Sequence, residues 1–197
     1  STAGLTDVAH KNGVTVGTLM SIPFGNSVYL TSWRSDVYSR VLFRLTQKSG
    51  DKYLYAEPLV RMMKYYGING IGFNSEFRTS SSVMTQLSEF FVACHKEAEK
   101  LNWKFEVHWY DGTSDDGQIH FDGGLGYHNQ KIFGDKDNIA TDMLFANYNW
   151  GPGNLSASVN TANRLGRSSF DYYAGFDIQG RGLRQASWSA LLDNDIS

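Results

Sequence analysis

Short apolar runs alternate with helical patterns along this 197-residue chain, and the later runs end in polar residues. We predict strands over residues 14–21, 68–73, 104–110, 143–148 and 172–178. Strands that alternate with helices in this way form βα units around a parallel sheet. This alternation limits the possible folds more than any other feature of the sequence.

The apolar spacing between these runs predicts helices over residues 5–11, 52–66, 82–101 and 161–168. The longest of them carries a single apolar stripe, formed by Val83, Leu87, Phe90, Phe91, Cys94 and Ala98. Cys94 is the one cysteine in the chain, which excludes an intrachain disulfide and a multi-cysteine zinc site. We therefore expect Cys94 to be a small core residue.

Polar residues at the carboxyl ends of parallel strands are typical of two folds, the eight-stranded barrel and the doubly wound sheet. No glycine-rich phosphate loop of the GxGxxG or GxxxxGK type follows the first predicted strand, so a nucleotide-binding sheet has little support. We predict an α/β fold, a (β/α)8 TIM barrel, with residues 1–197 as part of one barrel domain. Five predicted strands are fewer than eight, and a barrel typically has about 250 residues, so we expect barrel strands beyond both ends.

Charge and composition narrow the function classes. The chain has 18 Lys and Arg against 20 Asp and Glu, without the basic stripe of a nucleic-acid-binding protein. No apolar run approaches the roughly 20 residues needed to cross a bilayer, so we expect no membrane insertion. No HExxH or similar ligand spacing is present, so we predict no metal and no cofactor. The 5 Trp, 11 Tyr and 12 Phe exceed the need of a core, and aromatic surfaces stack on sugar rings.

Asn74 and Glu76 follow the second predicted strand, two residues apart, so both side chains are expected on the same side of the backbone. A carboxylic acid in this position can protonate a leaving oxygen, while a carboxamide beside it holds and polarises a neighbouring group of the substrate. The alternative is that both residues cap the helix that follows. The sequence is compatible with both roles.

Several segments resemble motifs of glycoside hydrolase family 85, the endo-β-N-acetylglucosaminidases. They are AHKNGVTVGT (9–18), YYGING through NSE (65–76), WYD (109–111) with Gly117 and Ile119, FANYNW (145–150) and AGFDIQGRG (174–182). Their order and spacing agree with the family over almost the whole chain, so the resemblance is more specific than any one motif.

The resemblance implies cleavage of the β-1,4 bond between the two core GlcNAc residues of N-linked glycans or glycoproteins, with retention of configuration. In this family the 2-acetamido group of the substrate attacks the anomeric carbon and forms an oxazoline. By resemblance, Glu76 is the general acid and then the base, and Asn74 orients the acetamido group. Tyr110 is expected to bind the same group from the opposite side. An internal nucleophile removes the need for a second catalytic carboxylate.

Five further residues are predicted to bind substrate: Phe121, Trp150, Asn147, Asp177 and Asp111. Phe121-Asp122-Gly123 stands where the family usually has Trp-Gln-Asn, a departure that bears on the glycan class or the acceptor. Three of these residues have a second interpretation. Trp150 is a sugar-stacking wall or a core residue, Asp177 binds a hydroxyl or pairs with Arg181, and Asp111 touches substrate or anchors its loop.

Two other functions compete with this one. The first is a carbohydrate-binding barrel without turnover, although a silent barrel has no reason to keep Asn74, Glu76 and Tyr110. The second is a conventional retaining glycosidase in which Asp111 or Asp177 is the nucleophile.

The compartment is not encoded in any motif. The chain begins with Ser1 rather than Met, so a missing leader is uninformative. Our expectation is a secreted or cell-surface protein of a microbe.

Overall fold

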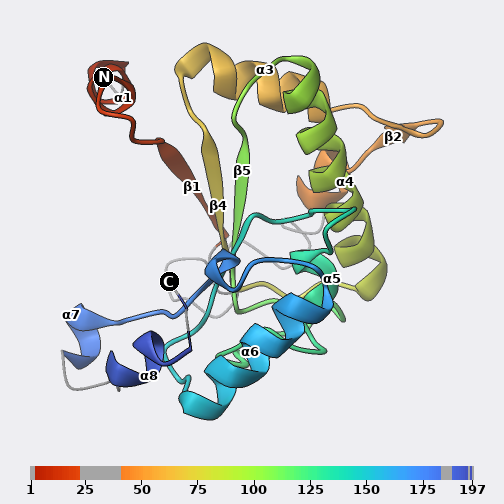
Figure 1. Cartoon of the computed structure of the whole chain (residues 1–197). Coiled ribbons are helices and arrows are strands. Elements are labelled where there is room, and N and C mark those ends of the chain that lie inside the picture. The colour runs from red at the N-terminus through yellow and green to blue at the C-terminus, as the bar shows by residue number, and fades with distance from the viewer. Residues whose placement is uncertain (1–2, 23–40, 183–187, 195, 197) are drawn as a thin grey trace.

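The structure, a computed structural model, describes residues 3–22, 41–182, 188–194 and 196 (Figure 1). Its centre is a five-stranded sheet with the order β1-β4-β5-β6-β7, in which every neighbouring pair is parallel. The strands are β1 (Gly17–Ile22), β4 (Gly70–Ser75), β5 (Glu106–Tyr110), β6 (Met143–Phe145) and β7 (Tyr172–Tyr173). All five were predicted, with ends that differ by a few residues.

Helices join these strands along one side of the sheet, as Figure 1 shows for α3 and α4 beside β4 and β5. The helices are α1 (Ala3–Lys11), α3 (Ala56–Tyr66), α4 (Ser81–Lys100), α5 (Gln130–Phe133), α6 (Pro152–Arg164), α7 (Ile178–Arg181) and α8 (Trp188–Leu192), with a 3-10 turn at Ser169–Asp171. A doubly wound sheet reverses its strand order, whereas this sheet follows the chain order throughout. The predicted (β/α) barrel is therefore confirmed, with five of its strands in the part that the structure describes.

The core lies between the sheet and its helices. Alternate side chains of β4 and β5 point toward α4, and Phe73 and Trp109 among them are almost fully buried. The Trp109 ring centroid is 5.7 Å from that of Phe73 and 6.2 Å from that of Phe91. The buried stripe of α4 consists of Met84, Leu87, Phe90, Phe91, Cys94 and Ala98, as predicted except that Met84 takes the place of Val83.

Cys94 is fully buried in that stripe. Burial raises the pKa of its thiol, which keeps the side chain in its protonated, unreactive form. The expectation of a core cysteine is confirmed.

The opposite face of the sheet is the inner face of the barrel, and its side chains are only partly buried. Gly70 and Gly72 of β4 leave room there for His108, whose ring comes within 3.4 Å of a Cβ built on Gly70. Leu19 of β1 is 67% exposed on this face, beside Gly72. The inner face therefore holds both small and polar residues in the positions from which a barrel forms its site.

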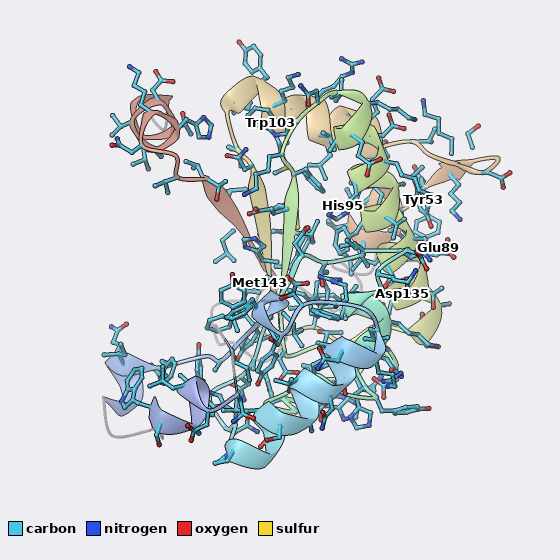
Figure 2. All side chains as sticks on the ribbon, viewed as in Figure 1. Tyr53, Glu89, His95, Trp103, Asp135 and Met143 are labelled. Atoms are coloured by element: carbon cyan, nitrogen blue, oxygen red, sulfur yellow. The ribbon has the colours of Figure 1, made fainter. Side chains whose placement is uncertain are left out.

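The predicted helix over 52–66 begins four residues later than expected. Lys52–Tyr53 is strand β3, paired with β2 (Lys48–Ser49) through a turn in which Gly50 has φ 59°. The Tyr53 hydroxyl donates to Glu89 Oε2 of α4 at 2.7 Å, and both residues are labelled in Figure 2. This contact with a helix far along the chain gives the hairpin its position, and no local pattern shows it.

Two predicted elements near the C-terminal end also differ. The helix expected over 161–168 is α6, which begins at Pro152 and buries Leu155, Ser158 and Ala162. The strand expected over 172–178 pairs with β6 only at Tyr172–Tyr173. None of the described helices is both long and apolar enough to cross a membrane.

Candidate active site

A cavity of about 420 Å³ runs along the inner face of the sheet, from Gly17 at the start of β1 to Asn74 and Tyr110 near the carboxyl ends of β4 and β5. Its lining comes from four neighbouring strands and includes Asn74, Tyr110, Met143, Phe145 and Tyr148 (Met143 is labelled in Figure 2). Asn74 and Tyr110, predicted from sequence to act on one substrate group, thus line one cavity from adjacent strands. Glu76 is not part of that lining and lies on the loop directly after β4.

Burial alternates through the residues that carry the predicted acid. Ser75 and Phe77 are 0% and 3% exposed, whereas Asn74 and Glu76 are partly exposed. This alternation matches the expectation that Asn74 and Glu76 point away from the core together. Within the described part of the chain, no hydrogen bond or ion pair reaches the Glu76 carboxylate, so it is available to a substrate.

The helix-capping alternative for these two residues fails. Helix α4 begins with Ser80 as its N-cap, and the Ser80 hydroxyl accepts the N–H of Val83 at 3.3 Å. Asn74 and Glu76 lie four or more residues before that cap. Their side chains therefore have no part in starting α4.

The loop after β5 holds the backbone around Glu76. The Thr113 hydroxyl lies 3.0 Å from the carbonyl oxygen of Ser75 and 2.6 Å from that of Phe77, and it accepts the Phe77 N–H at 3.1 Å. The Thr113 N–H also donates to the Ser75 carbonyl at 2.7 Å. Gly112 passes so close that a Cβ built on it would lie 2.2 Å from the Ser75 carbonyl oxygen. The position of Glu76 is thus defined by residues on both of its sides.

Tyr110 has a fixed orientation at the end of β5. Its hydroxyl donates to Asn147 Oδ1 at 2.8 Å. Its ring centroid lies 6.1 Å from that of Phe121, 6.0 Å from Phe145 and 6.4 Å from Tyr148. The structure therefore brings together four of the predicted site residues, Asn74, Tyr110, Phe121 and Asn147.

Asp111 directly follows Tyr110 at the end of β5. It is 1% exposed, and its carboxylate accepts the N–H of Gly123 at 2.6 Å, the Asn129 amide at 3.1 Å and the N–H of Asn147 at 3.4 Å. Burial raises the pKa of this carboxyl to about 6, against the lowering effect of these donors. The loop-anchor interpretation describes this position, and we withdraw Asp111 from the residues that touch substrate.

The segment from Gly112 to Asn138 contains the short helix α5 and carries Phe121. Phe121 is the residue of this segment that reaches Tyr110, and its φ of 52° lies in the left-handed region. The Phe121 carbonyl accepts the Asn149 amide at 2.8 Å, and the Gly123 carbonyl accepts the Tyr172 hydroxyl at 3.1 Å. These bonds hold the Phe121 ring beside Tyr110.

Trp150 and Asp177 are not among the residues that line the described cavity. The Trp150 indole donates to the Gly175 carbonyl at 2.8 Å, and its ring meets the ring of Phe176 edge-on at 5.3 Å. Asp177 accepts the N–H of Gly180 at 2.8 Å and caps α7. The Arg181 side chain lies outside the described part of the chain, so the predicted pair is untested.

Sequence reasoning missed Thr113 and Ser75, which position the loop that carries Glu76, and Tyr148, which lines the cavity. A signal exists for the first two, since Gly112 directly follows the polar end of a strand. A glycine there indicates a close backbone approach.

A family model and several curated proteins match this chain. The family model described as Glycosyl hydrolase family 85 matches residues 2–193. The cytosolic endo-beta-N-acetylglucosaminidase of Gallus gallus is 27% identical over 179 residues, which are 90% of this chain and 22% of that protein. Cytosolic endo-beta-N-acetylglucosaminidase 2 of Arabidopsis thaliana is 28% identical over 180 residues, 90% of this chain and 22% of that protein. The chain thus spans about a fifth of these relatives.

A solved structure agrees with this result. The glycoside hydrolase domain of Spr0440, Endo-D from Streptococcus pneumoniae R6, superposes with a TM-score of 0.80 at 25% identity. The match covers 95% of this chain and 29% of that one.

The expectation of a secreted or cell-surface protein is wrong. It is overturned by the five curated relatives, which are all named as cytosolic proteins, in animals and in a plant alike.

Proposed function

Because the chain belongs to glycosyl hydrolase family 85, we propose that the protein containing it is an endo-β-N-acetylglucosaminidase. Its substrates would be N-linked glycans or glycoproteins, cleaved at the β-1,4 bond between the two core GlcNAc residues. The names of the curated relatives support this activity. We further propose that residues 1–197 are part of a single catalytic barrel domain.

The observation that carries the proposal is the arrangement around one cavity. Asn74 and Tyr110 line it from adjacent strands, and Glu76 follows Asn74 on a loop with well-defined backbone contacts. A general acid, an amide and a phenol in this arrangement are what a substrate-assisted glycosidase requires. None of the three groups is buried out of reach.

In the proposed reaction, Asn74 and Tyr110 hold the 2-acetamido group so that its oxygen faces the anomeric carbon. That oxygen forms the new bond while the glycosidic bond breaks and Glu76 gives its proton to the leaving oxygen. The product is an oxazoline in its protonated form. Water then attacks the anomeric carbon while the Glu76 carboxylate takes a proton from that water. The bond from the anomeric carbon to the acetamido oxygen breaks, which restores the acetamido group and the Glu76 acid. Holding the acetamido group in attack geometry can supply about 7–11 kcal/mol at best.

The bond between Tyr110 and Asn147 supports this role. Because the Tyr110 hydroxyl donates to Asn147 at 2.8 Å, the phenol oxygen keeps one orientation in the cavity. With its one proton given to Asn147, this oxygen is left to accept a hydrogen bond from the acetamido group, and a side chain with a locked rotamer loses little entropy when the substrate binds.

The conventional two-carboxylate mechanism has less support. The carboxylate of Asp111 is buried among three N–H donors, and that of Asp177 caps a helix. A nucleophile must reach the anomeric carbon from the face opposite the acid. Neither carboxylate is presented to the cavity in which Asn74 and Tyr110 meet.

The test is to incubate the full-length protein with an N-glycopeptide and to identify the product by mass spectrometry. A peptide that retains a single GlcNAc supports the proposal. A protein that binds the glycan without cleaving it would instead be a carbohydrate-binding barrel. A fluorosugar adduct on an aspartate would indicate the conventional mechanism, whereas strong inhibition by an oxazoline analogue supports substrate assistance.

A further inference from the structure

Three side chains of the loop between β5 and β6 gather beside the candidate site without a part in the proposed reaction. His120, Asp122 and His128 place their ligand atoms within 4.8 Å of one another. His128 Nδ1 is 3.0 Å from Asp122 Oδ2. The rings of His120 and His128 stack with centroids 4.3 Å apart and an angle of 19° between their planes. The sequence spacing predicted no metal site, and only the fold brings these groups together.

Two imidazoles and one carboxylate form a donor set for a transition metal. Imidazole nitrogen suits Zn²⁺, Cu²⁺ and Ni²⁺, whereas Mg²⁺ and Ca²⁺ are held by oxygen ligands. Zinc binds nitrogen and carboxylate oxygen at about 2.0–2.2 Å, which sets tetrahedral ligand atoms about 3.4 Å apart. The side chains are partly exposed, 30% for His120 and 45% for His128, so small rotations bring their ligand atoms to this spacing.

A fourth group lies next to these three. Asp116 Oδ2 is 2.9 Å from His120 Nε2, and its side chain is 51% exposed. Asp116 can complete a tetrahedral site or orient the His120 ring, as carboxylates commonly do around metal-bound histidines. Asp116 and Asp122 thus bring two carboxylates to the cluster, and carboxylate oxygens attract a cation.

One residue of the candidate active site is flanked in the sequence by two members of this cluster. Phe121 lies between His120 and Asp122, with φ 52°, and its ring is 6.1 Å from that of Tyr110. A phenylalanine in the left-handed region needs surrounding contacts to hold it there. An ion bound to its two sequence neighbours and to His128 would supply such a contact.

We propose that His120, Asp122 and His128 bind a divalent transition-metal ion of the zinc class, and that the ion holds Phe121 in place beside Tyr110. The proposal goes beyond the glycosidase activity and its test needs no glycan. A failure of the metal-binding proposal is therefore distinguishable from a failure of the proposed glycosidase activity.

The experiment is a Zn²⁺ titration of the chelator-stripped, full-length protein by calorimetry, repeated for variants with the fold checked by circular dichroism. His128→Gln and His120→Gln are expected to weaken Zn²⁺ binding at one site by at least about 10–100-fold, as even second-shell losses do. His10→Gln is the matched control, since His10 lies on α1 and bonds Asn69, and it should bind Zn²⁺ like the wild type.

Hydrogen exchange gives a second measurement. If these three side chains only stabilise the loop and bind no metal, adding Zn²⁺ would leave the exchange rates unchanged. Zn²⁺ is expected to slow exchange over residues 118–128 in the wild type and in His10→Gln, but not in His128→Gln. Two results would overturn the proposal. One is a wild type that takes up no Zn²⁺, and the other is equal Zn²⁺ affinity in His128→Gln and His10→Gln.

Discussion

The hydroxyl of Thr113 hydrogen-bonds the backbone of Phe77, accepting its N–H at 3.1 Å and lying 2.6 Å from its carbonyl oxygen. The same hydroxyl is 3.0 Å from the carbonyl of Ser75, so one side chain contacts the residues on both sides of Glu76. Loops carry functional groups well only when a rigid scaffold fixes them. Thr113 is therefore a positioning residue for the proposed acid.

Thr113→Val keeps the shape of the side chain but removes the hydroxyl. The buried Phe77 N–H then has no acceptor, which costs about 1–3 kcal/mol of stability. We expect kcat to fall by about 10²-fold, the cost of a 1 Å displacement of a catalytic group, with a smaller change in KM. Thr113→Ser keeps the hydroxyl and should restore most of kcat. Equal kcat values for the Val variant and the wild type would remove Thr113 from the positioning of Glu76.

Gly112 supports the same loop through its lack of a side chain. A Cβ at this position would lie 2.2 Å from the Ser75 carbonyl oxygen, so Gly112→Ala must displace the end of β4. We expect a loss of about 1–3 kcal/mol in stability, as for other overpacked positions, together with reduced turnover.

Gly126→Ala is the matched control for this prediction, because a Cβ there meets no atom within 4 Å. Its stability should stay within about 0.5 kcal/mol of the wild type. Thermal unfolding and glycopeptide turnover of both variants check the difference. Unchanged stability and turnover in Gly112→Ala would show that the close approach is not needed.

The strands and their polar ends were predictable because both follow from local patterns. Apolar runs identified β4 and β5, and Asn74, Glu76 and Tyr110 were found at or just after the ends of these runs. The bonds between Thr113 and Ser75 were not predictable, since they join residues 38 positions apart and a threonine in a loop has no distinctive pattern. The role of Asp111 depended on burial, which the sequence does not show.

Helix α6 illustrates a different limit. Its buried face consists of Leu155, Ser158 and Ala162, of which only the leucine is strongly apolar. A helical stripe built from small residues gives a weak periodic signal. The predicted start of this helix, residue 161, is therefore nine residues later than its observed start at Pro152. Pro152 at the first turn was the available signal, because proline favours that position.

The buried carboxyl of Asp111 makes the stability of the fold depend on pH. Its pKa is raised to about 6 in the folded protein, against about 3.9 in an unfolded chain. Between pH 4 and 6 the folded state binds more protons, so the free energy of unfolding falls as the pH rises through this window. The shift of about two units corresponds to roughly 3 kcal/mol as an upper value.

Asp111→Asn should remove this part of the pH dependence, because the amide does not titrate. We expect the stability of the wild type, relative to Asp111→Asn, to decrease from pH 4 to pH 7. The control is Asp137→Asn, which changes an acid whose side chain is 70% exposed. Denaturant unfolding at several pH values measures the effect. The assignment would be contradicted by parallel pH profiles of the wild type and Asp111→Asn.

Glu76→Gln tests the proposed acid directly. The amide keeps the size of the side chain but has no proton to give, and the Glu76 carboxylate has no described partner whose loss would destabilise the fold. We expect hydrolysis to fall by about 10²–10⁴-fold while glycan binding stays close to that of the wild type. Retention of most activity would exclude Glu76 as the general acid.

Variants of Asn74 allow the two steps of the proposed reaction to be tested independently. A preformed oxazoline bypasses the attack that Asn74 assists but still needs Glu76 as the base. Asn74→Ala and Asn74→Gln should therefore hydrolyse natural glycans poorly, yet transfer an oxazoline donor to a GlcNAc acceptor. Glu76→Gln should fail in both reactions. Because Ser80 caps α4, loss of a helix cap cannot explain a defect in the Asn74 variants. If these variants stay folded and lose both reactions equally, the substrate-assisted mechanism is wrong and a carboxylate nucleophile must be sought.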